Sequence, residues 1–163
     1  TPVPGRMERY GGDGTPTVVV DYAHTPDALH SALQALRAHL GDAGKLWCVF
    51  GCGGERDTGK RAEMAKAAEA LADHIIVTDD NPRHESAEQI RQQILSGFSD
   101  TANPIEIGDR REAVATAIKQ AALQDVVLIA GKGHEAYQDI QGVRHAYADS
   151  EEIQRAFAGR RSH

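Results

Sequence analysis

Short apolar runs alternate with helix-patterned segments along almost the whole chain, and this alternation constrains the fold more than any other feature. We expect strands at residues 17–22, 45–50, 74–78, 104–107, 125–130 and 143–147, helices between the first five of them, and a last helix at 150–157. The strands lack regular polar alternation, which indicates burial on both faces. The sequence therefore predicts an α/β fold: a three-layer, Rossmann-like, open and mostly parallel sheet of about six strands with helices on both faces.

Several expected helices carry recognisable capping residues. Thr25 is a typical N-cap, and Pro26 behind it is favoured at the first helical position. Gly41 follows the last apolar position of the same helix and is expected to end it. Ser86 and Asp109 are each followed three residues later by Gln or Glu, a pattern typical of a helix start.

Length and composition fit one domain. We expect residues 1–14 to be a linker from an upstream domain, 15–158 to be the domain itself, and 159–163 to be a frayed tail. The net charge of −6 argues against general nucleic-acid binding. No apolar run approaches the roughly 20 residues of a membrane span. Cys48 and Cys52 are too few for a disulfide scaffold, so we expect free thiols, a reducing cytoplasm and no metal site.

The segment Asp80-Asn81-Pro82-Arg83 directly follows an expected strand. Pro82 fixes its own φ and biases Asn81 away from helix, so the loop has a stiff backbone. Arg83 can grip a carboxylate in a planar fork, and Asp80 can hold an ammonium group. A loop with both charge signs suits a zwitterion such as an amino acid, although an ordinary turn with a solvated arginine also fits.

The other unusual loops also follow strands. They cover residues 23–26, 51–61, 79–83, 108–110 and 131–135. Because ligands of open α/β sheets bind beyond the carboxyl ends of the strands, we expect these five loops to meet at one rim. His24, Lys132 and Glu135 lie in them, and for each the residues alone leave structural and binding roles open.

Residues 54–60 fit the G-x-x-x-x-G-K pattern of a phosphate-binding loop. The next residue should be Ser or Thr, which would hold Mg²⁺, but it is Arg61. A true P-loop is therefore disfavoured. The pattern fits better with a backbone that binds an anion, or with a loop that holds Arg56 over the rim.

Five motifs in register together resemble the C-terminal domain of the Mur ligases, and among them the members that add diaminopimelate. They are Gly5–Glu8, Asp21–Asp27, Gly51–Asp57, Asp80–Arg83 and Gly131–Glu135. The resemblance implies a third domain that admits the amino acid, while a missing central domain mostly holds ATP and Mg²⁺. It also implies a bacterial, cytoplasmic ligase that joins meso-diaminopimelate to UDP-MurNAc-L-Ala-D-Glu through an acyl phosphate. It implies that this fragment contains no catalytic residue and would be inactive alone.

The resemblance also implies roles for particular residues. Those expected to bind diaminopimelate are Arg56, Asp80, Asn81, Pro82, Arg83, Gly131 and Glu135. Those expected to face the nucleotide are Arg6, Asp21 and His24. Arg83 is expected to select diaminopimelate over lysine, which lacks the second carboxylate. The competing hypotheses are a P-loop-like nucleotide kinase or ATPase, and a non-catalytic Rossmann-type binding module.

Overall fold

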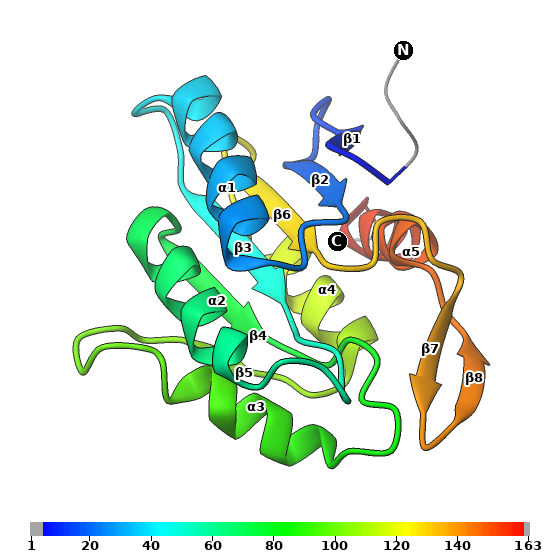
Figure 1. Ribbon diagram of the computed structural model, residues 1–163. Helices are drawn as coiled ribbons and strands as arrows, with labels where there is room; N and C mark the ends of the chain where they lie inside the picture. The colour runs from blue at the N-terminus through cyan, green and yellow to red at the C-terminus, as the bar shows by residue number, and fades with distance from the viewer. Residues whose placement is uncertain (1–4, 162–163) are drawn as a thin grey trace.

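The computed structural model describes residues 5–161 and forms a three-layer α/β sandwich (Figure 1). The strands are β1 (Glu8–Gly11), β2 (Thr17–Asp21), β3 (Leu46–Phe50), β4 (His74–Val77), β5 (Ile105–Glu106), β6 (Val126–Ala130), β7 (Tyr137–Ile140) and β8 (Val143–Ala146). The helices are α1 (Pro26–Leu40), α2 (Gly59–Leu71), α3 (Ala87–Leu95), α4 (Arg110–Gln120) and α5 (Asp149–Arg161).

The main sheet has six strands in the order β1-β2-β6-β3-β4-β5. All neighbouring pairs are parallel except β1 with β2, which is antiparallel. Every residue of β3 and β6, at the centre of the sheet, is buried. The predicted open, mostly parallel sheet is therefore confirmed.

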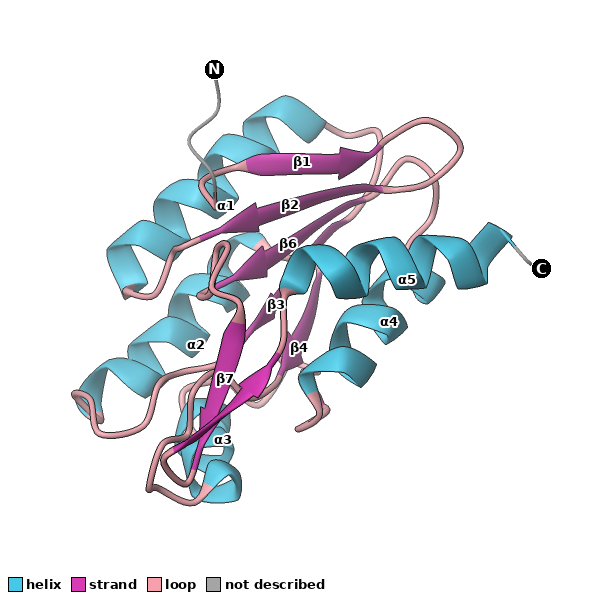
Figure 2. Ribbon diagram, turned by 90° about the vertical axis from the view of Figure 1, so that its right-hand side faces the viewer, coloured by secondary structure: helices cyan, strands magenta, loops and turns pink. Residues whose placement is uncertain are grey.

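Helices cover both faces of the sheet (Figure 2). On one face α1, α2 and α3 bury a core that includes Leu33, Met64 and Ile94. On the other face α4 and α5 pack on a second core that includes Ile118 and Phe157. Each core lies between a helical layer and one side of the same strands, which explains why the strands read as continuous apolar runs.

The predicted helix starts are also confirmed. The Thr25 side chain accepts a hydrogen bond from Ala28 N, and Pro26 opens α1. Gly41 ends α1 with a φ of 61°, a left-handed conformation that favours glycine. The side chains of Ser86 and Asp109 cap α3 and α4 in the same way.

The membership of the sheet differs from the prediction at two places. The expected strand at 143–147 is β8, which pairs with β7 in a separate hairpin instead of joining the main sheet. Its turn residues, Gln141 and Gly142, both have positive φ, the conformation of a tight antiparallel hairpin. The sixth strand of the main sheet is β1, which lies inside the segment predicted as a linker and has no apolar run to reveal it.

The C-terminal helix is longer than predicted. It runs through Arg161, so residues 159–161 of the predicted frayed tail are helical. Arg160 donates to the carbonyl oxygens of Ile118 and Lys119 at 2.8 and 3.0 Å, which anchors this last turn on α4. Residues 1–4 of the predicted linker and 162–163 of the tail lie outside the described residues. Within residues 5–161, no helix is long and apolar enough to cross a membrane.

Candidate functional site

A pocket of about 430 Å³ opens beyond the carboxyl ends of the parallel strands. It is lined by Tyr22, His24, Thr25, Gly51, Cys52, Gly53, Arg56, Asp57, Lys60, Arg61, Met64, Asp80, Asn81, Arg83 and Glu135. These residues come from the loops after β2, β3, β4 and β6 and from the start of α2. The prediction that loops far apart in sequence meet at one rim is confirmed for these four loops.

The fourth predicted loop does not reach the pocket lining. Its Arg110 is buried and pairs with the buried carboxylate of Asp149 at 2.9 Å. Arg110 also donates to the carbonyl oxygens of Asp79 and Ala130, each at 3.1 Å. This loop therefore reaches the same rim, where Asp79 N donates to Gly108 O at 3.3 Å, but it contributes no residue to the pocket lining.

Five of the seven residues predicted to bind an amino acid line this pocket, as does His24. The five are Arg56, Asp80, Asn81, Arg83 and Glu135. Pro82 and Gly131 are not in the lining and shape the loops behind it. Gly131 has a φ of 116°, and a Cβ there would lie 2.6 Å from Asp80 Oδ2.

Arg6 and Asp21 lie outside the pocket lining. Arg6 is exposed. The two carboxylate oxygens of Asp21 accept hydrogen bonds from Met7 N and Ala23 N, each at 2.9 Å. His24 Nδ1 lies 2.7 Å from Tyr22 O, and because a carbonyl oxygen only accepts, Nδ1 carries the proton there.

The Asp80–Arg83 loop is held from two sides. Arg83 adopts a left-handed backbone with a φ of 56°. Its N–H donates to Asp139 O at 3.0 Å, and its own carbonyl accepts from Gln141 N at 2.6 Å, so the β7–β8 hairpin braces it. On the other side its Nη1 donates to Gly54 O at 2.8 Å. These contacts fix an arginine at the pocket in an otherwise disfavoured conformation.

The glycine-rich loop approaches the same segment without room for a side chain. Gly54 N donates to Asn81 O at 2.7 Å. A Cβ on Gly54 would lie 1.8 Å from Pro82 O, so only glycine fits there. The near-P-loop pattern thus includes a glycine required for loop-to-loop packing.

Arg61, which stands where a P-loop would have Ser or Thr, makes internal contacts. Its side chain is 1% exposed and forms a bidentate pair with Glu85 at 2.9 and 3.0 Å. It also donates to Gly53 O at 3.0 Å. The Gly59 N–H at the start of α2 is taken by the Asp57 carboxylate at 2.9 Å, so an acidic side chain already uses the position where a phosphate would accept.

Lys132 is the important residue that sequence reasoning left undecided. It is fully buried, and its ammonium contacts Asn81 Oδ1 at 2.7 Å and Tyr137 O at 3.0 Å. It also lies 3.3 Å from Asp80 Oδ1 and 3.5 Å from Glu135 Oε1. The position of Lys132 in the Gly131–Glu135 loop indicates that it lies near the site. Its contact with Tyr137 O depends on the β7–β8 hairpin, whose place outside the main sheet is not predicted from the sequence.

Burial disfavours the thiolate form of both cysteines by raising their pKa. Both are free, as predicted. Burial raises the pKa of Cys52 to about 12, with a further contribution from the Asp80 carboxylate. Burial also raises the pKa of Cys48 well above its usual range. Among residues 5–161, no group of three or more His, Cys, Asp or Glu side chains could hold a metal ion.

Comparison with known proteins gives the family. The family model described as "Mur ligase, glutamate ligase domain" matches residues 5–133. Two curated relatives are named UDP-N-acetylmuramoyl-L-alanyl-D-glutamate–2,6-diaminopimelate ligase. That of Pseudomonas aeruginosa is 55% identical over 154 residues, which cover 94% of this chain and 31% of the relative. That of Xanthomonas campestris is 58% identical over 150 residues, which cover 91% and 30%.

A solved structure of a ligase with the same name superposes with a TM-score of 0.90 at 47% identity, covering 99% of this chain and 32% of that one. The chain thus spans about a third of the length of the relatives it matches. The fold and these matches show that the chain belongs to the Mur ligase family and corresponds to the C-terminal domain of its members.

Proposed function

We propose that this chain is the amino-acid-binding domain of an ATP-dependent ligase that adds meso-diaminopimelate to UDP-MurNAc-L-Ala-D-Glu in peptidoglycan synthesis. The observation that carries the proposal is the gathering of Arg56, Arg83 and Glu135 around one pocket. The names of the relatives, which cover nearly the whole chain, support the same substrate. We further infer a bacterial, cytoplasmic enzyme. Residues 1–14 would lead from the upstream domain, and within them the strand β1 pairs with β2.

The charges of the pocket suit a molecule with an amino-acid group at each end. Arg56 and Arg83 would each meet a carboxylate, for which the guanidinium fork is well shaped. Glu135, whose side chain is 32% exposed, would accept from the ammonium group that does not react. Asp80 is less accessible, since its carboxylate already faces Lys132, so it would act mainly through the charge balance of the site.

The remaining predicted residues have supporting roles in this proposal. Asn81 would offer its amide to the ligand. Pro82 and Gly131 would shape the backbone around it. Arg6, Asp21 and His24 stay proposed as nucleotide-facing, and His24 is the one of the three that lines the pocket.

In the proposed reaction, ATP phosphorylates the D-glutamyl carboxyl group, and an amine of diaminopimelate attacks the acyl phosphate. A C–N bond forms, phosphate leaves with the electron pair of the C–O bond, and the amine nitrogen gives up one proton to the solvent. This chain would contribute alignment of the amine, which can supply a large share of a barrier reduction. Its described residues do not fit Mg²⁺ or a P-loop phosphate, so we assign both to the rest of the ligase.

Arg83 tests the proposal in the full-length ligase. Arg83→Ala should raise the KM for diaminopimelate by roughly tenfold to a hundredfold, because one carboxylate loses its charged partner. The KM for ATP should change little, and the preference for diaminopimelate over lysine should shrink, because lysine has no second carboxylate. Unchanged kinetics would favour a non-catalytic binding module instead. Binding of Mg-ATP by this chain alone, with no diaminopimelate effect, would favour a nucleotide kinase or ATPase.

A further inference from the structure

Lys132 is a buried cation beside a pocket it does not line. Removing an ammonium group from water is costly unless oxygen atoms replace the lost hydration. Here four residues supply such oxygens: Asn81, Asp80, Glu135 and Tyr137. Three of these four belong to the set proposed above to bind the amino acid, which connects the buried cation to the site.

The first consequence concerns the Asn81 amide. Its Oδ1 accepts from Lys132 Nζ at 2.7 Å and from Asp139 N at 3.0 Å. Two donors on one atom identify it as the oxygen, so the other end of the amide is the NH₂ group. That Nδ2 lies 3.3 Å from Glu135 Oε1 and therefore donates toward it. Lys132 thus helps to decide which end of Asn81 faces Glu135.

The second consequence concerns charge. The carboxylates of Asp80 and Glu135 both lie within 3.5 Å of the Lys132 ammonium. Without this cation, two carboxylates beside the pocket would lose a charged partner, and unpaired charges that are partly removed from water are costly. Lys132 therefore holds Glu135 in place before any ligand ammonium arrives.

The third consequence concerns the hairpin. Lys132 donates to Tyr137 O at the start of β7, and Gln138 Nε2 donates to Asp80 O at 2.7 Å. The same hairpin braces the backbone of Arg83. Lys132 is therefore the point at which the Gly131–Glu135 loop, the Asp80–Arg83 loop and β7 are joined.

We propose that Lys132 is a positioning residue for the amino-acid site, which acts by orienting Asn81 and Glu135 rather than by touching the ligand. This inference rests on the proposed function and extends it to a residue behind the pocket. Because Lys132 is fully buried, its effect must pass through the residues it holds.

The test uses the full-length ligase with Lys132→Met, which keeps most of the side-chain length but removes the charge. The KM for diaminopimelate should rise roughly tenfold to a hundredfold, as expected when a buried hydrogen-bonded charge is removed. The KM for ATP and for the UDP-linked substrate should stay within about twofold, because we assign those sites mainly to the rest of the ligase. If Lys132→Met does not fold, Lys132→Gln, an uncharged donor, is measured in its place.

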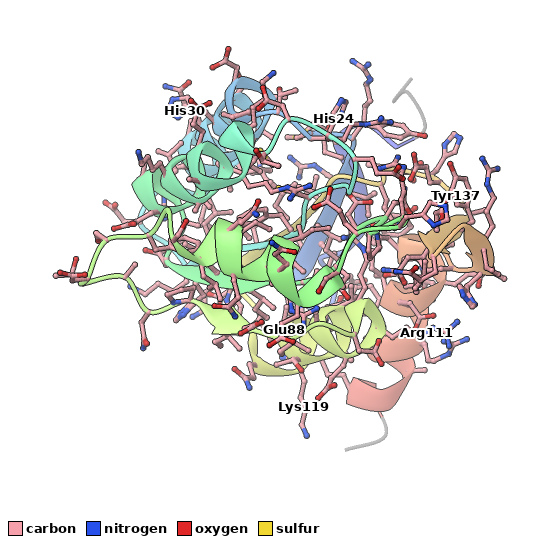
Figure 3. All side chains as sticks on the ribbon, turned by 60° about the horizontal axis from the view of Figure 1, so that its bottom comes forward. His24, His30, Glu88, Arg111, Lys119 and Tyr137 are labelled. Atoms are coloured by element: carbon pink, nitrogen blue, oxygen red, sulfur yellow. The ribbon has the colours of Figure 1, made fainter. Side chains whose placement is uncertain are left out.

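The matched control is Lys119→Met. Lys119 is an exposed lysine of α4 whose side chain extends away from the protein (Figure 3). All three KM values should be unchanged in this variant. An effect equal to that of the Lys132 variant would show a general response to losing a lysine charge, which would overturn the proposal.

A double-mutant cycle with Glu135→Gln separates positioning from mere stability. If Lys132 acts through Glu135, its replacement should have much less effect on the KM for diaminopimelate once Glu135 is neutral. Fully multiplicative effects, or an equal rise of all three KM values, would overturn the inference. Absence of diaminopimelate-dependent amide formation in the unsubstituted ligase would instead overturn the proposed function, so the two failures are distinguishable.

Discussion

The ion pair of Glu85 with Arg61 supports the glycine-rich loop of the pocket wall, and its strength depends on pH. Its carboxylate accepts from both terminal nitrogens of Arg61 and from Glu55 N at 2.6 Å. The hydrogen bonds from Arg61, and then the one from Glu55, lower the pKa of Glu85 to about 2. Since Arg61 also holds Gly53 O, protonation of Glu85 would loosen the loop that carries Arg56.

The pH dependence of stability checks this pair. An unfolded glutamate has a pKa of about 4.3, so Glu85 stabilises the fold above about pH 5 and loses that contribution as the pH falls toward 2. Glu85→Gln should therefore lower the melting temperature at pH 7, and the difference from the unsubstituted chain should shrink on acidification. Glu63→Gln, an exposed change on α2, serves as the control. A difference that stays constant with pH would contradict this assignment.

At the scale of elements, the site depends on how loops pack on each other. The loop after β3 lies against the loop after β4 through a backbone contact of Gly54 with Asn81, and the β7–β8 hairpin supports the other side. The hairpin is mostly exposed, so its position comes from these hydrogen bonds more than from apolar burial. The pocket wall is thus built mainly from packed loops, with the start of α2 as its helical part.

Two glycine substitutions separate loop packing from helix propensity. Gly54→Ala should destabilise the chain by roughly 1–3 kcal/mol or more, because its Cβ would meet Pro82 O and the backbone cannot yield. Gly159→Ala, in α5 with no atom within 4 Å of its Cβ, should stabilise it by about 0.5–1 kcal/mol. Denaturant unfolding measures both free energies, and a tolerated Gly54→Ala would show that the two loops can separate.

At the scale of the whole molecule, residues 5–161 form a pocket wall, and we propose that the rest of the ligase completes the reaction centre. The helix start that follows the near-P-loop is occupied by Asp57. We therefore propose that amino-acid binding and ATP-dependent activation are divided between domains of the full-length ligase.

The isolated chain should fold but show no ligase activity. Cooperative thermal unfolding should be seen, because both core layers are complete within the described residues. Phosphate release from Mg-ATP in the presence of diaminopimelate and the UDP-linked substrate should stay at background, while the full-length ligase is active in the same assay. Amide formation by the chain alone would contradict the assignment of ATP and Mg²⁺ to other domains.

Much of the fold was predictable because it depends on neighbours in sequence. The caps at Thr25, Ser86 and Asp109 involve atoms within three residues of one another. The apolar runs of the parallel strands report burial on both faces directly. The rule that ligands bind beyond the strand ends was then enough to predict that Arg56 and Arg83 lie at one rim.

What the sequence alone determined, then, was the alternating architecture and four of the expected loops that line the pocket, since both follow from local patterns. Only the tertiary structure decided that the Lys132 and Arg61 side chains are buried against residues of the pocket loops, and that β8 pairs with β7 outside the main sheet. The physical reason is distance along the chain: Lys132 meets Asn81 across 51 residues, and Arg61 meets Glu85 across 24. A charged side chain looks solvated in sequence until the fold brings its oxygen partners around it.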